Sequence, residues 1–234
     1  MTEDTIYKSY LHISEKKFAL SIFKSENSKK IYEKTLSLEN FSNRIKFTEL
    51  NDFLETNIYD IEKKIGSFIE EICIIYDSKD FFQTMISIKN NNNGNQINYK
   101  SLSRPLQIAR EECVKTLGNN KIIHMMINKY TIDNKEYSDL PKDLNCKYFS
   151  LDIKFICISR EIIKKLEILM KKFHISVKEI ISANYLESFF NDSEKDLDIW
   201  AMRIDNGFNE NEVRFNEKIR ENKGFFERFF NFFS

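Results

Sequence analysis

The stretch that decides the fold is KYFSLDIKFICISREIIKKLEILMKKFHISVKEIISANYLESFF, residues 147–190. Its first part, 147–158, alternates apolar and polar residues, which predicts a strand covered on one face. From Ser159 to Phe173 the apolar residues recur at helical spacing, and Glu161 stands in the first turn, where a helix dipole favours an acid. A short strand over 175–181 and a short helix over 182–190 are expected to follow.

The same periodicities organise the rest of the chain around this stretch. Helices are predicted over 48–65 and 103–117, the first capped by Thr48 and the second carrying Pro105 in its first turn. The NNNNGN tract at 90–95 is typical of a hairpin tip. Strands are predicted over 10–23 (one long strand or a pair), 31–38, 72–76, 82–88, 97–99, 121–133 and 199–204. This order predicts an α/β chain into which a second, smaller α+β unit is set.

Composition excludes several classes of protein. The 234 residues are 41 % hydrophobic, enough to form a core, so disorder of the whole chain is excluded. Lys and Arg number 36, as do Asp and Glu, and this balance argues against nucleic acid as a partner. Four cysteines occur without metal-ligand spacing, so reduced thiols are expected. Residues 1–4 are acidic, which argues against a signal peptide, and no apolar run is long enough to span a bilayer.

The strongest amphipathic signal is KGFFERFFNFFS, residues 223–234. On a helix its phenylalanines share one face, while Glu227, Arg228 and Asn231 share the other, as in helices that lie in a membrane interface. The alternative is a helix docked on the protein's own core. Polar residues 205–222 predict a flexible linker, which favours a membrane-bound helix over one docked on the protein's own core. The predicted membrane-binding residues are Lys223, Phe225, Phe226, Arg228, Phe229, Phe230, Phe232 and Phe233.

Residues 121–190 resemble the bacterial actin-like cell division protein FtsA. In KIIHMMINKYTID, residues 121–133, the closing Tyr130, Ile132 and Asp133 fit that family, while Asn128 stands at its usual Pro; further on, His174 replaces its usual Gly. The resemblance is weaker over YLHISEKKFALSI (10–22) and DIWAMRIDNGF (198–208). The segment GFFERFFNFF (224–233) is similar to the family's membrane-targeting helix. The ordered series, rather than any one motif, carries the resemblance.

The resemblance implies half of an actin-like (ribonuclease H-like) fold with a C-terminal amphipathic helix. Residues 1–79 and 159–204 would form one actin-like lobe, and 80–158 would be the inserted α+β subdomain through which protomers touch. The linker 205–222 and the membrane-targeting helix 223–234 would follow. The second lobe, which carries most adenosine contacts in that family, is expected to be missing.

The residues themselves predict poor nucleotide binding. Actin-like phosphate loops need small residues and a metal-binding acid, because backbone N–H groups must approach the phosphates. The first loop would be His12 to Glu15, where His12 replaces the acid and the Glu15 carboxylate repels phosphate. The second would be Asp205 to Asn209, where Phe208 and Asn209 replace the small residues of the turn. No cofactor and no metal are therefore expected.

No catalytic residue is expected either. His12, His124 and His174 are far apart in sequence and no nucleophile motif accompanies them; His124 is interpreted as a satisfied, partly buried side chain. The predicted function is that of an FtsA-type adaptor, peripheral on the cytoplasmic face of the inner membrane. Its expected partners are membrane lipids, division proteins (FtsZ, FtsA-interacting or FtsN-like proteins) and a second copy of itself. The alternatives are an actin-like ATPase completed by a partner chain, a PilM-like membrane-assembly adaptor, and a decayed gene product.

Overall fold

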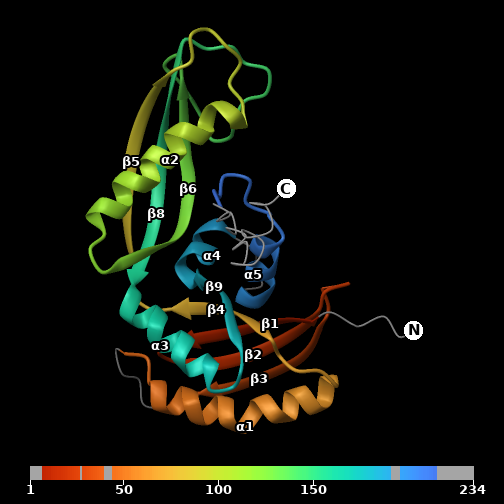
Figure 1. Cartoon of the computed structure of the whole chain (residues 1–234). Coiled ribbons are helices and arrows are strands. Elements are labelled where there is room, and N and C mark those ends of the chain that lie inside the picture. The colour runs from red at the N-terminus through yellow and green to blue at the C-terminus, as the bar shows by residue number, and fades with distance from the viewer. Residues whose placement is uncertain (1–6, 27, 40–43, 191–195, 215–234) are drawn as a thin grey trace, which may run out of the picture.

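The computed structural model describes residues 7–26, 28–39, 44–190 and 196–214. In these residues two β-sheets stand one above the other, joined by a continuous polypeptide that passes from one to the other and back (Figure 1). The lower sheet is built from the two ends of the described chain, and the upper sheet from its middle.

The lower sheet has the strand order β3-β2-β1-β4-β9. The chain enters it as a meander, in which β2 pairs antiparallel with both β1 and β3, whereas β4 pairs parallel with both β1 and β9. Residues 10–23 are therefore a pair of strands rather than one long strand. The bounds are β1 (Tyr7–Ser14), β2 (Lys17–Lys24), β3 (Lys30–Ser37), β4 (Glu71–Asp77) and β9 (Ser176–Ser182).

Helices cover both faces of the lower sheet. One face packs on α1 (Phe47–Ile65) and α3 (Arg160–Lys171), whose apolar stripes share one core with alternate residues of the strands. The other face packs on α4 (Ala183–Phe189) and α5 (Leu197–Asp205), in a second core that includes Trp200. Because both faces are covered, β1, β2 and β4 are buried along almost their whole length.

The upper sheet has the order β5-β8-β6-β7, and all its pairings are antiparallel. One face packs on α2 (Tyr99–Thr116) in a third core, and the other face is polar. The alternation in β8 causes this division, because Phe149, Leu151, Ile153 and Phe155 are buried while the residues between them are not. The strands are β5 (Phe82–Asn91), β6 (Asn120–Ile132), β7 (Lys135–Tyr137) and β8 (Tyr148–Ser159).

The upper sheet is inserted between two strands of the lower one. β5 begins five residues after β4 ends (82 − 77), and β8 runs directly into α3, which leads to β9. Ser159 closes β8 and also caps α3, because its Oγ accepts a hydrogen bond from the Glu161 N–H at 3.2 Å. After α3, His174 adopts a left-handed φ of 59°, at the position where the resembled family has Gly.

Four local predictions were wrong. Residues 199–204 form part of helix α5 and not a strand, since Asp196 caps a helix there by accepting from the Asp198 and Ile199 N–H groups. Residues 97–99 form no strand, because Asn98 and Ser101 make a capping box that starts α2 at Tyr99. Pro105 accordingly lies inside α2 rather than in its first turn. Thr48 does not cap α1, whose N-cap is Lys46 without a side-chain bond.

Candidate functional site

The carboxyl ends of the parallel strands β1, β4 and β9 lie side by side at one edge of the lower sheet. In open α/β sheets this edge is where ligands bind, and the first predicted phosphate loop falls on it. Here the strands end at Ser14, Asp77 and Ser182. The chemistry of this edge therefore decides whether a phosphate group could bind.

The β1–β2 turn uses its own amide groups. The Ser14 hydroxyl accepts hydrogen bonds from the Lys17 N–H at 2.9 Å and the Lys16 N–H at 3.2 Å, and it donates to the Lys17 carbonyl at 3.0 Å. These N–H groups directly follow the predicted loop, His12 to Glu15, and they bond Ser14 instead of being available to a phosphate. The turn is thus satisfied internally.

His12 supplies no charge at this edge. It lies within β1 with 5 % of its surface exposed, and its pKa is lowered to about 4, first by burial and then by the charge of Lys17. The imidazole is therefore neutral at physiological pH. It therefore supplies neither the negative charge of a metal-binding acid nor a positive charge that would attract a phosphate.

Carboxylates surround the strand ends instead. The pKa of Asp77 is raised above its ordinary value by burial, and further by the nearby carboxylates of Glu187 and Glu15. Lys16 and Lys17 act in the opposite direction without reversing the shift. This edge is consequently unfavourable for a polyanion such as a nucleotide triphosphate.

The second predicted phosphate loop is the end of a helix. The Asn206 N–H donates to the Met202 carbonyl at 3.0 Å, and the Gly207 N–H donates to the Ile204 carbonyl at 2.9 Å. Gly207 has a φ of 82°, as is usual where a helix closes. The C-terminal end of a helix carries partial negative charge, which disfavours phosphate.

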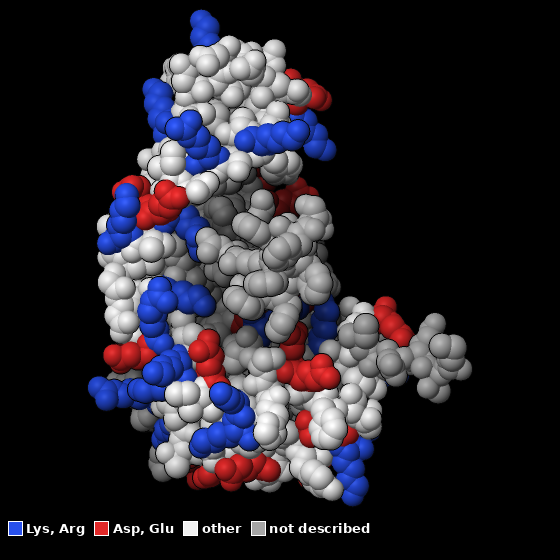
Figure 2. Space-filling view, viewed as in Figure 1, with Lys and Arg blue, Asp and Glu red and all other residues white. Residues whose placement is uncertain are grey.

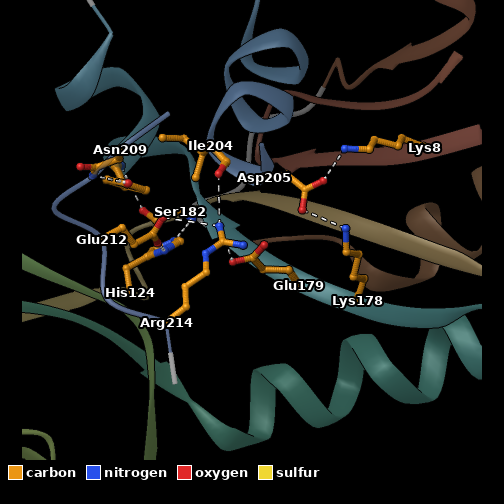
Figure 3. Close-up of polar contacts among 11 residues, drawn as sticks. Lys8, His124, Lys178, Glu179, Ser182, Ile204, Asp205, Asn209, Glu212 and Arg214 are labelled. Atoms are coloured by element: carbon orange, nitrogen blue, oxygen red, sulfur yellow. Dashed lines mark hydrogen bonds and ion pairs between the residues drawn. The ribbon is translucent and has the colours of Figure 1, made fainter. Parts of the chain in front are cut away.

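Asp205, at the end of α5, joins that helix to the lower sheet. Its carboxylate accepts from the Lys8 and Lys178 amines, each at 2.8 Å (Figure 3). Burial alone would raise the pKa of Asp205, but these hydrogen bonds and the two positive charges outweigh it and hold the pKa below its ordinary value. Asp205 is therefore occupied as a structural ion-pair partner of β1 and β9.

Residues 206–214, here called the strap, run from α5 to the upper sheet. The Ile127 N–H donates to the Asn211 carbonyl at 2.9 Å, and the Val213 N–H donates to the Met125 carbonyl at 2.8 Å. The strap thus pairs with β6 beside the point where β7 pairs with it. The prediction of a flexible linker over 205–222 was wrong for residues 205–214, because the chain is fixed there; residues 215–222 lie outside the described part.

A buried polar network fastens the strap to both sheets. His124 of β6 has a fully buried side chain, and its Nδ1 lies 2.8 Å from Glu212 Oε1 of the strap (Figure 3). Its Nε2 accepts from the Ser182 N–H at the end of β9, at 3.2 Å. Because a backbone N–H can only donate, Nε2 carries no proton, and Nδ1 donates to Glu212. His124 therefore ties together β6, β9 and the strap.

Arg214 completes the network from the far end of the strap. Its guanidinium lies 3.5 Å from both Glu179 and Glu212, and it donates to the Ile204 carbonyl at 3.4 Å. Burial would raise the pKa of Glu212, but the hydrogen bond from His124 and the charge of Arg214 lower it overall. Glu179 has its pKa raised, because burial outweighs the attraction of Arg214. Glu212 is thus the charged partner of the pair.

The donor atoms of His124, Glu179 and Glu212 lie within 4.8 Å of one another, close enough to hold a metal ion. Imidazole and carboxylate ligands would suit a divalent transition metal. However, both ring nitrogens of His124 already have partners, and Arg214 supplies the positive charge. The fit to a metal is therefore poor, and the geometry is that of a structural network.

The sequence indicated one member of this network and missed the others. The sequence predicts His124 to be a satisfied, partly buried side chain; the structure confirms that it is satisfied and shows that it is fully buried. His12 and His174 are not brought to it as hydrogen-bond partners. Nothing local marks Glu179, Glu212 or Arg214, because Glu179 stands beside a second charged residue, Lys178, in β9.

The outer edge of the upper sheet is β5, which pairs with β8 on one side and, among the described residues, with no strand on the other. Along it Met85 is 55 % exposed and Phe82 is 41 % exposed. On the face shown in Figure 2, Lys and Arg are interspersed with Asp and Glu over the lower sheet and its helices. That part of the face therefore offers no broad cationic surface for nucleic acid.

All the predicted membrane-binding residues, from Lys223 to Phe233, lie outside the described residues. Among the helices that are described, none combines the length and the apolarity needed to cross a bilayer.

Comparison with known proteins relates this chain to others through its fold. No family model matches the chain, and no curated protein matches it significantly. A chain of the PilM–PilN type IV pilus biogenesis complex superposes with a TM-score of 0.50 at 6 % identity, covering 79 % of this chain and 50 % of that one. The cytoplasmic domain of EpsL, an inner-membrane component of the type II secretion system of Vibrio cholerae, gives 0.40 at 10 % identity, with coverages of 77 % and 59 %.

A third solved structure is a Bacteroides thetaiotaomicron protein described as having an actin-like ATPase fold and unknown function. It gives a TM-score of 0.32 at 17 % identity and covers 80 % of this chain and 57 % of that one. This chain thus spans between half and three fifths of the length of these solved chains. The topology and the likeness to the pilus chain show the fold alone. The described residues form half of an actin-like fold with an inserted α+β subdomain, as predicted, whereas the finer resemblance to FtsA stays a prediction.

Proposed function

We propose that this chain is a non-enzymatic adaptor that attaches to the cytoplasmic face of the inner membrane through residues 223–234 and acts through protein–protein contacts. The observation that carries the proposal is the use of both predicted phosphate loops by the chain's own hydrogen bonds, at Ser14 in one and at Gly207 in the other. An actin-like scaffold without its nucleotide chemistry retains surfaces for binding partners.

Nucleotide hydrolysis is disfavoured by charge as well as by geometry. The strand ends are surrounded by the carboxylates of Glu15, Asp77 and Glu187, and these would repel a triphosphate that approached. A partner chain that completed the site would bring further groups, but the Lys16 and Lys17 N–H groups would still be bonded to Ser14. The ATPase alternative is accordingly the weaker one.

The inserted subdomain supplies the surface proposed for partners. The outer edge of β5 has backbone groups available along ten residues, and an added strand from a partner or a second copy could pair with them. The polar face of the upper sheet carries an ion-paired group of Lys129, Glu136 and Asp152. Contacts with lipids, with division proteins of the FtsZ, FtsN-like or FtsA-interacting kinds, or between copies are all proposals.

The cellular process is proposed to be division, on the ordered resemblance of residues 121–190 to FtsA. The likeness to the pilus chain, with its TM-score of 0.50, favours a second candidate, an adaptor of pilus or secretion assembly. A fluorescent fusion of the full chain distinguishes the two. A band at midcell supports division, and foci that follow a pilus or secretion machine support the second candidate.

Removal of residues 223–234 is expected to abolish co-sedimentation with vesicles of phosphatidylglycerol and phosphatidylethanolamine. Burying a phenylalanine contributes at most about 1.5–3 kcal/mol, and partial insertion and helix ordering reduce this to a net anchor of a few kcal/mol. Losing that energy weakens binding by about 100-fold. The measurement is the bound fraction across a lipid titration.

A matched control keeps the charges of the segment and removes its apolar face. Replacement of all six phenylalanines by Ser is expected to weaken binding as strongly as the deletion, whereas Asn231→Ser is expected to leave it unchanged; the six are Phe225, Phe226, Phe229, Phe230, Phe232 and Phe233. Undiminished co-sedimentation of the deleted protein would show that residues 223–234 are not the anchor.

A further inference from the structure

Three apolar side chains are exposed on α4, on α5 and at the start of the strap. Phe208 is 53 % exposed, Ile199 is 41 % exposed and Phe189 is 40 % exposed. The rings of Phe189 and Phe208 contact edge to face, with centroids 6.1 Å apart. Ile199 lies one helical turn before Arg203, whose guanidinium stacks 4.1 Å from the Phe208 ring centroid. These residues, Phe189, Ile199 and Phe208, are here called the aromatic patch.

The aromatic patch rests on a rigid base of buried rings. Phe208 stacks on Phe190 with centroids 5.5 Å apart, and Phe190 stacks on Trp200 at the same separation. Phe190 and Trp200 are 5 % and 2 % exposed. Ordered, exposed aromatic surface of this kind is typical of a docking site, because its burial costs little side-chain entropy.

The described chain ends on α5, the helix that carries Ile199. Arg214, the last described residue, donates to the Ile204 carbonyl, and the Phe208 N–H donates to the Arg203 carbonyl, so both ends of the strap are bound to α5. The eleven residues 215–225 can span up to roughly 35 Å when extended. The phenylalanines of 225–233 can therefore reach the aromatic patch of the same chain.

Charge near the aromatic patch also favours residues 225–233 as the segment that binds there. Glu187 lies on the same helix as Phe189, where together with Glu15 and Asp77 it forms the anionic edge of the lower sheet, whereas Arg203 places one positive charge on the Phe208 ring itself. Anionic lipid would be repelled there. The basic residues that precede the Phe-rich segment, Lys218, Arg220 and Lys223, would be attracted.

We propose that, away from lipid, residues 225–233 dock in cis on the aromatic patch, so that the patch and the membrane compete for the same phenylalanine face. This inference rests on the proposed membrane attachment. In the docked state residues 225–233 are not available to lipid. A partner that binds the aromatic patch makes them available again. Membrane binding thereby becomes conditional on occupancy of a site on the folded body.

The test uses the full chain and its single tryptophan. Trp200 lies one ring away from Phe208, and all four native cysteines are buried, so a nitroxide can be attached selectively to Asn231→Cys. The quantity measured is the ratio of Trp200 fluorescence with the nitroxide to that with a diamagnetic analogue of the label. We expect a ratio well below one in solution and close to one after addition of the same vesicles.

Phe208→Ser and, separately, Ile199→Ser are expected to bring the ratio to one in solution and to raise vesicle affinity, by roughly tenfold if most chains are docked. A ratio of one in the unsubstituted background, or unchanged vesicle affinity in both variants, overturns cis docking. A low ratio without any vesicle binding keeps the docking and rejects the membrane anchor, so the two proposals fail separately.

Discussion

His124→Ala is expected to lower the free energy of unfolding by about 3 kcal/mol. The substitution removes a fully buried ring that bonds Glu212 through Nδ1 and the Ser182 N–H through Nε2, and that packs 4.5 Å from the Tyr185 ring centroid. Glu212, whose side chain is 6 % exposed, is left with Arg214 at 3.5 Å. A buried charge that loses its partner is among the costly changes in a protein. Urea unfolding at neutral pH measures the loss.

The pH dependence of this loss separates the network from simple packing. The pKa of Glu212 lies below its ordinary value, so its stabilisation is complete above the ordinary carboxyl pKa and is lost as the pH falls through the folded pKa. Glu179, with its raised pKa, acts with the opposite sign in both proteins. The difference between the two proteins should therefore be smaller at an acid pH, below the ordinary carboxyl pKa, than at neutral pH. Equal differences at both pH values would show that the ring acts only by packing.

Two variants serve as controls for His124. Glu212→Gln keeps an acceptor for Nδ1–H but removes the charge near Arg214, and it is expected to cost about 1 kcal/mol. Lys121→Ala, at an exposed position of the same strand, is expected to change stability by less than about 0.5 kcal/mol.

Phe155→Ala is expected to cost about 3–5 kcal/mol. Phe155 is fully buried in β8, the strand between β5 and β6, and it packs in the core beneath α2. Truncation of a buried phenylalanine loses its transfer free energy and leaves a cavity that close-packed neighbours fill poorly. Equilibrium unfolding measures the cost.

The location of the effect tests the division into two sheets. Because the cores beneath α2 and beneath α1 are separate, amide exchange in Phe155→Ala should accelerate over 82–159 more than over the lower sheet. Lys154→Ala, one residue earlier and on the polar face, is the matched control and should remain within about 0.5 kcal/mol of the parent. Equal acceleration throughout the chain would mean that the two sheets unfold as one unit.

Strong periodicity explains which elements could be predicted. The stripe of α1 and the alternation of β8 are dictated by burial on one face, and both elements lie within a residue or two of their predicted bounds. The strand predicted over 199–204 was wrong because a short apolar run has no decisive period. An ion pair of Asp198 with the distant Lys30 helps to fix these residues as a helix. Pairing of the strap with β6 was beyond prediction, since it joins residues more than eighty positions apart.

At the candidate site, the sequence could predict only which residues depart from an actin-like phosphate loop. Glu15 and the replacements at His12 and Phe208 showed in the sequence that the phosphate loops depart from the actin-like pattern. The positive feature, a strap locked by His124, Glu212 and Arg214, depends on tertiary contacts between three elements. Such networks leave no spacing signal, because His124, Glu179 and the pair in the strap come from segments far apart in the sequence.

Equilibrium binding of labelled ATP with Mg²⁺ to the full chain tests the central claim most directly, since the account attributes the protein's activity to contact and not to turnover. The closed turn at Ser14 and the carboxylates around Asp77 predict no saturable binding up to millimolar nucleotide. Saturation at micromolar nucleotide, with one site per chain, would contradict it.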